Sequence, residues 1–86
     1  MSGKKKVLMA GNNPEVAGYL RNFIPLLGNY EMEQAFNHME ALAKIHAFEP
    51  ELVLLDFDTP QIEAGKILRE IRSGHSSLRI LALVRD

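Results

Sequence analysis

The chain has 86 residues, a net charge of −1, 47% hydrophobic and 24% charged residues, and no cysteine. This length suffices for a single domain spanning residues 1–86, and the balanced charge gives no electrostatic basis for binding nucleic acid or an acidic membrane. Without cysteine the protein has neither a disulfide framework nor thiolate chemistry.

The first predicted strand is Lys6–Ala10, which follows two further lysines that we interpret as a solvated lead-in. Its apolar part is too short for a signal peptide or a membrane span, so we expect a cytoplasmic protein with no membrane partner. A helix is predicted next, because Asn13 is a good N-cap, Pro14 suits the first helical position, and apolar residues recur at helical spacing up to Leu27. Pro25 lies inside that pattern and should kink or end the helix.

Strand-like and helix-like segments continue to alternate along the chain. Residues 30–36 predict a weaker edge strand, because acidic and less polar side chains alternate there. Asn37 can cap a second helix, which Glu49–Pro50 ends. A third helix carries apolar residues at 67–71, and the last strand, 79–84, is apolar on both faces.

The segment Leu52–Leu55 is the most informative part of the chain, because it leaves no polar side to face water and is followed at once by Asp56. This pattern is typical of a central strand in a parallel sheet with helices on both faces. The element order is βαβαβαβ, and right-handed crossovers then give an α/β fold. Ligands bind such sheets at the carboxyl ends of the strands, where Asp56 is expected to lie.

Four segments, in order and at fixed spacing, carry a recognisable set of motifs. Residues 7–16 form a strand that leads into Asn-Pro, and residues 37–42 are similar to the signature Asn-Gly-x-Glu-Ala-Leu. Residues 52–65 are similar to Asp-x-x-Met-Pro-x-x-Asp-Gly, and residues 68–72 match the helix that follows. Together the segments resemble the response-regulator receiver domain (CheY-like) of two-component signal transduction.

The resemblance implies a flavodoxin-like, receiver-like sheet in the order 2-1-3-4, without the family's last helix–strand–helix. It also implies that Asp56 accepts a phosphoryl group from a sensor histidine kinase. In the family a Mg²⁺ ion spreads the charge of the transferring group, and it prefers oxygen ligands in an octahedron. The matching ligands here would be Asp56, the backbone carbonyl of Asp58 and the family's acidic pair.

The chain departs from the family at the residues that bind the metal and read the phosphoryl group. The acidic pair falls on Gly11 and Asn12, which offer no side-chain oxygen and one neutral oxygen, and the switch hydroxyl falls on Val84. We therefore expect no firmly bound cofactor, only weak Mg²⁺ binding through Asn12, Asp56 and Asp58, with slow phosphorylation. We favour a simple turn into the helix cap as the role of residues 11 and 12, over an anion-binding nest.

The leading hypothesis is a pseudo-receiver domain that transmits a signal by protein contact and is not an enzyme. Its partner would be a sensor histidine kinase or an output domain, and no nucleic acid. The alternative is a functional phosphoacceptor that uses Asp56. A less favoured hypothesis is a small-ligand-binding flavodoxin-like module, for which no phosphate-cradling loop is visible. The three histidines lie on separate segments without ligand spacing, and we interpret them as surface residues.

The fourth strand has a consequence for assembly. In the order 2-1-3-4, residues 80–84 form an open edge that is apolar on both faces and carries no proline or charge. We therefore expect a homodimer through this exposed fourth strand.

Overall fold

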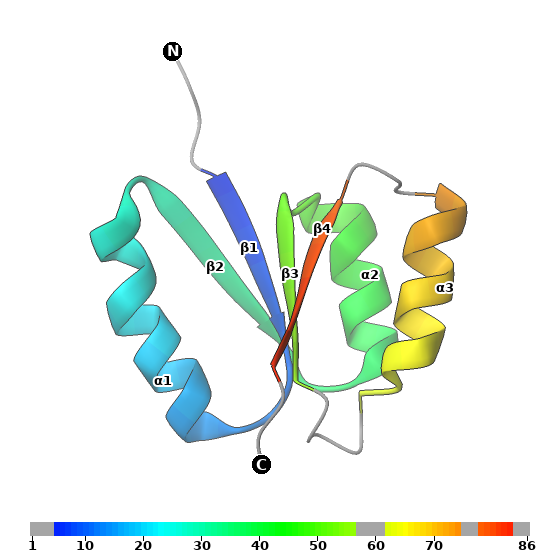
Figure 1. Cartoon of the computed structure of the whole chain (residues 1–86), viewed down its shortest axis with the longest axis horizontal. Coiled ribbons are helices and arrows are strands. Elements are labelled where there is room, and N and C mark those ends of the chain that lie inside the picture. The colour runs from blue at the N-terminus through cyan, green and yellow to red at the C-terminus, as the bar shows by residue number, and fades with distance from the viewer. Residues whose placement is uncertain (1–4, 57–61, 75–77, 84–86) are drawn as a thin grey trace.

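A computed structural model describes residues 5–56, 62–74 and 78–83. Four parallel strands form one sheet in the order β2-β1-β3-β4, which confirms the expected α/β fold and strand order (Figure 1). The elements in chain order are β1 (Lys5–Ala10), α1 (Pro14–Phe23), the 3-10 turn η1 (Ile24–Leu27), β2 (Tyr30–Ala35), α2 (His38–Phe48), β3 (Leu52–Asp56), α3 (Ala64–Gly74) and β4 (Arg79–Leu83).

Helix α1 begins and ends where local chemistry predicts. The side-chain oxygen of Asn13 accepts hydrogen bonds from the backbone N–H groups of Glu15 (2.9 Å) and Val16 (3.1 Å). Pro25 has no N–H with which to continue the α-helical ladder, so the chain continues as the single turn η1. The predicted interruption of this helix is confirmed.

Helix α2 has comparable boundaries. The side chain of Asn37 accepts a hydrogen bond from the N–H of Glu40 (2.8 Å), and Glu49 ends the helix in the left-handed conformation (φ 54°), with Pro50 after it. At ten or eleven residues, no α-helix in the described part of the chain is long enough to cross a bilayer.

The two faces of the sheet carry unequal cores. Helices α2 and α3 cover one face, and α1 lies on the other (Figure 1). Ten described residues are buried in the cluster under α2 and α3, including Leu8 and Leu55, whereas the cluster under α1 contains only Val7, Ile24 and Leu54. Neighbours such as Val7 and Leu8 belong to different clusters because successive residues of a strand point to opposite faces.

Strand β4 is an outer strand that pairs only with β3 among the described strands. Leu81 pairs in register with Leu54 and therefore lies on the α1 face, where it is 53% exposed. Val84, which the sequence assigns to the end of this strand, lies outside the described residues.

Candidate functional site

Asp56 is the last residue of β3 and lies at the carboxyl edge of the sheet. Strand β3 runs between β1 and β4, so Asp56 is flanked by the end of each, and it is only 1% exposed. This is the edge at which parallel sheets bind ligands. The structure places the carboxylate where the strand pattern predicts it, and its role as phosphoacceptor stays a prediction.

Gly11 lies directly against Asp56. A Cβ atom added to Gly11 would come 2.7 Å from the Cβ of Asp56 and 3.2 Å from its Oδ2. Carbon atoms at 2.7 Å overlap strongly, and both would be bonded to backbone, so no side-chain rotation could separate them. The first position of the family's acidic pair therefore has no room for any side chain in this backbone.

The backbone of Gly11 is held by a polar network that sequence reasoning missed. Its N–H donates to the carbonyl of Ala35 (2.9 Å), and its carbonyl accepts from the side-chain amide of Gln34 (2.9 Å). The oxygen of that amide accepts from the guanidinium of Arg21 on α1 (3.2 Å). Gln34 is almost fully buried on the face of β2 that also carries Met32. In the sequence, a polar glutamine on an otherwise apolar face of the strand could have indicated this network.

The next two residues of the loop have different uses. Asn12 is exposed beside Gly11, whereas the side-chain oxygen of Asn13 is already engaged in capping α1. The geometry favours the predicted turn into the helix cap.

Beyond the central strand, Glu63 joins the starts of α2 and α3. Its carboxylate lies 3.1 Å from Nδ1 of His38 and 3.0 Å from Nζ of Lys66. The hydrogen bond from Lys66 holds the pKa of Glu63 below its ordinary value, the charges of Lys66 and His38 act in the same direction, and partial desolvation opposes them. His38 is thus a half-exposed partner of Glu63 and His46 is exposed, while His75 lies outside the described residues.

The Glu63 carboxylate provides a pH prediction. Lys66→Met should raise the Glu63 pKa toward its ordinary value of 4.5, as measured by NMR titration of the side chain. A lowered pKa in the folded state stabilises that state above the unfolded pKa, and this stability is lost as pH falls through the folded value. The small stability that Lys66→Met removes should therefore be seen at neutral pH and should disappear in acid, where Glu63 is protonated in both proteins. Lys44→Met, which removes the partner of Glu33, is the matched control and should leave the Glu63 titration unchanged.

The described residues are a poor fit for Mg²⁺. Asp56 supplies one carboxylate and Asn12 one neutral oxygen, and Gly11 leaves no room for a second acid. Within 5–56, 62–74 and 78–83, no three acidic, histidine or cysteine side chains converge to hold a metal ion. Asp58 and Val84 lie outside these ranges, so their roles stay predictions.

The solved structures that share this fold include a response regulator and a pseudo-receiver domain. The response regulator RPA3017 in red light signaling of R. palustris superposes with a TM-score of 0.76 at 21% identity, covering 91% of this chain and 64% of that one. The pseudo-receiver domain of the CikA protein gives a TM-score of 0.75 at 16% identity, covering 99% and 71%. This chain has a receiver-like fold.

Curated relatives match most of the length of this chain. The sensor protein EvgS of Escherichia coli O157:H7 is 29% identical over 83 residues, which is 96% of this chain but 7% of EvgS. The protein-glutamate methylesterase/protein-glutamine glutaminase 3 of Rhodospirillum rubrum is 29% identical over 66 residues, 77% of this chain and 18% of that protein. The domain thus spans a small part of each relative. No protein-family model matches the chain.

Proposed function

We propose that this receiver-like domain serves two-component signalling mainly through protein contact, with Asp56 as an impaired phosphoacceptor. The impaired phosphoacceptor is inferred from the contact between Asp56 and Gly11, because this contact leaves no space for a second carboxylate that would help to hold Mg²⁺. The proposed partner is a sensor histidine kinase or an output domain, not nucleic acid or a membrane. We propose no enzymatic activity for the domain itself and a cytoplasmic location.

The similarity to EvgS, a sensor protein, and to RPA3017, a response regulator, supports the signalling part of the proposal. The likeness to the pseudo-receiver domain of CikA is one of fold and is consistent with a receiver that has lost its acidic pair. The alternative, a functional phosphoacceptor, draws on the position of Asp56 at the buried end of β3.

Mg²⁺ binding distinguishes the proposed protein-contact domain from the alternative, a functional phosphoacceptor. A Mg²⁺ titration followed by amide chemical shifts should not saturate at millimolar concentration, because one carboxylate and one amide leave most of the ion's octahedron to water. For the same reason, beryllofluoride should not bind, and a small phosphodonor should modify Asp56 slowly or not at all. The control is Asp56→Asn, whose Mg²⁺ titration should look the same. Saturation below about 1 mM that Asp56→Asn abolishes would favour the phosphoacceptor.

The small-ligand hypothesis has one observation in its favour. A hollow of about 850 Å³ lies at the amino ends of the strands, lined in part by Lys5, Tyr30 and Arg79. It is at the opposite edge from Asp56, and parallel sheets bind ligands at their carboxyl ends, so we do not favour it. A chromophore in the absorption spectrum of the purified protein would reverse this ranking.

A further inference from the structure

Helix α1 and turn η1 expose four large apolar side chains, those of Tyr19, Phe23, Leu26 and Leu27, with exposures from 42% to 80%. The rings of Tyr19 and Phe23 are stacked, with centroids 5.8 Å apart and an interplanar angle of 9°. At roughly 200 Å² for each large side chain, these four leave about 500 Å² of apolar surface in water. This area is in the upper part of the range for the largest apolar patch of a monomer, and such patches often serve binding.

The direction of this patch follows from the contacts of α1. Arg21 donates to Gln34 of β2, so that side of the helix faces β2. Phe23, two residues further on, lies roughly 200° around the helix and therefore on the side away from β2. Leu81 of β4 is half exposed on the same face of the sheet, where α1 is the only described helix (Figure 1).

We propose that the surface formed by Tyr19, Phe23, Leu26, Leu27 and Leu81, called here the α1 surface, docks against the same surface of a second copy. All five side chains are uncharged, so the surface meets itself without like-charge repulsion, and a two-fold axis closes the assembly as a dimer. A standard interface buries about 800 Å² on each partner. The patch on α1 and η1 supplies more than half of that area, and Leu81 adds to it.

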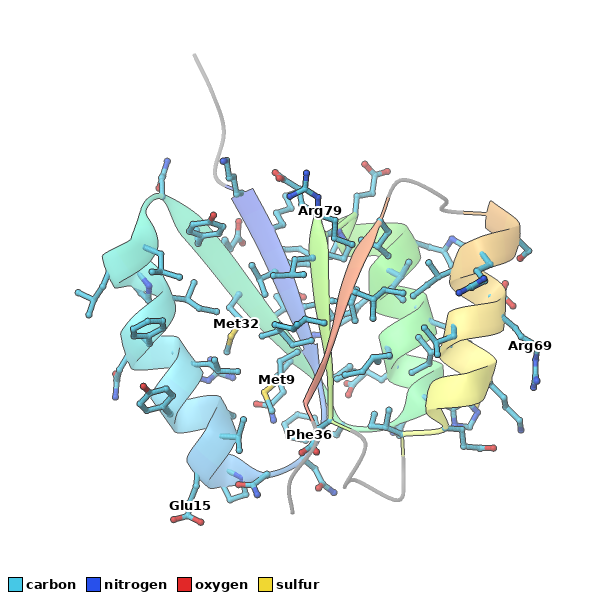
Figure 2. The ribbon with its side chains drawn as sticks, viewed as in Figure 1. Met9, Glu15, Met32, Phe36, Arg69 and Arg79 are labelled. Carbon is cyan, nitrogen blue, oxygen red and sulfur yellow. The ribbon has the colours of Figure 1, made fainter. Side chains whose placement is uncertain are left out.

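Charges at the two ends of this face determine how the copies are oriented. Glu15 lies at the start of α1 and Arg79 at the start of β4, so they occupy opposite ends of the face (Figure 2). Neither forms an ion pair with another described residue. A two-fold axis that sets the two α1 helices antiparallel brings Glu15 of one copy toward Arg79 of the other, twice in each dimer. A parallel arrangement would place Glu15 against Glu15, which is unfavourable.

This dimer goes beyond the proposed function, because the α1 surface does not include Asp56 and needs no phosphorylation. It also differs from edge-to-edge pairing of β4, the association that the sequence predicts. Edge pairing uses the free backbone groups of β4 and makes no demand on the side chain of Leu26.

The test is sedimentation of the 86-residue chain at micromolar concentration. The wild-type protein should form a dimer, and Leu26→Lys should weaken it at least roughly tenfold by placing a charge in the apolar contact. Leu26 is 80% exposed, so this change should not affect folding. The matched control is Met39→Lys, at a similarly exposed methionine on α2 across the sheet, which should leave the dimer unchanged.

Charge exchange tests the antiparallel arrangement. Glu15→Arg and Arg79→Glu should each weaken the dimer several-fold, and the two together should restore it, because the ion pair is rebuilt in the reverse sense. A wild-type monomer would overturn the proposal. A dimer that survives Leu26→Lys would show edge pairing instead, and a charge exchange without recovery would exclude the antiparallel geometry.

Discussion

Gly11→Ala is expected to destabilise the domain by about 1–3 kcal/mol, the usual cost of forcing an extra carbon into a packed site. The new Cβ would lie 2.7 Å from the Cβ of Asp56, and neither atom can rotate away from the other. Strands β1 and β3 would have to separate at their carboxyl ends. Urea unfolding followed by circular dichroism measures the loss.

The matched control is Gly18→Ala. Gly18 lies in the middle of α1, and an added Cβ there would meet nothing within 4 Å. Alanine should therefore stabilise the helix by up to about 1 kcal/mol, the opposite sign. If the two substitutions had the same effect, the contact between Gly11 and Asp56 would not be the cause.

A double-mutant cycle locates the contact. The cost of Gly11→Ala should fall in an Asp56→Gly background, which removes the opposing Cβ, and should persist in Asp56→Ala, which keeps it. Equal relief in both backgrounds would assign the clash to the carboxylate oxygens instead.

The same contact bears on attempts to rebuild a metal site. Gly11→Asp with Asn12→Asp restores the family's acidic pair in sequence, but the new carboxylate at position 11 must fit beside that of Asp56. Overpacking and like-charge repulsion act together there, so the double variant should be less stable and should still fail to saturate with Mg²⁺ at millimolar concentration. Saturation below about 1 mM would mean that the site lacks only charge.

The sequence predicts the fold well because the signals for it are local. Asn13 and Asn37 cap their helices through bonds to N–H groups two or three residues away, and Pro25 interrupts a helix by its own lack of an N–H. The two-sided apolar pattern of 52–55 identifies a central strand without any knowledge of its neighbours. Strand order then follows from the resemblance to the receiver family.

The site could be predicted only in part because its remaining features depend on distant pairs. The sequence shows only that Gly11 lacks the carboxylate expected at this position. The structure shows in addition that glycine is the only residue type that fits beside Asp56. The apolar period through Leu27 predicts a buried helix face, yet Phe23 and Leu27 are exposed. Beyond Pro25 the chain is a 3-10 turn, which changes the angle between successive side chains and turns Leu27 away from the sheet.

Gln34→Met should cost about 1–3 kcal/mol, because it leaves the buried carbonyl of Gly11 without a donor. Methionine is similar in size and flexibility, so the loss reports the hydrogen bonds more than the packing. Arg21→Met removes only the outer bond of the network, at an exposed residue, and should cost less than about 1 kcal/mol.

The contrast between these two variants tests whether the network positions the loop beside Asp56 or only attaches the Arg21 side chain to β2. If Gln34 positions the loop beside Asp56, Gln34→Met should shift the amide resonances of Gly11 and Asp56, and Arg21→Met should leave them in place. The double variant should cost little more than Gln34→Met alone, because the outer bond has no function once its acceptor is gone. Equal costs for the two single changes, with unmoved Gly11 and Asp56 resonances, would contradict this role for Gln34.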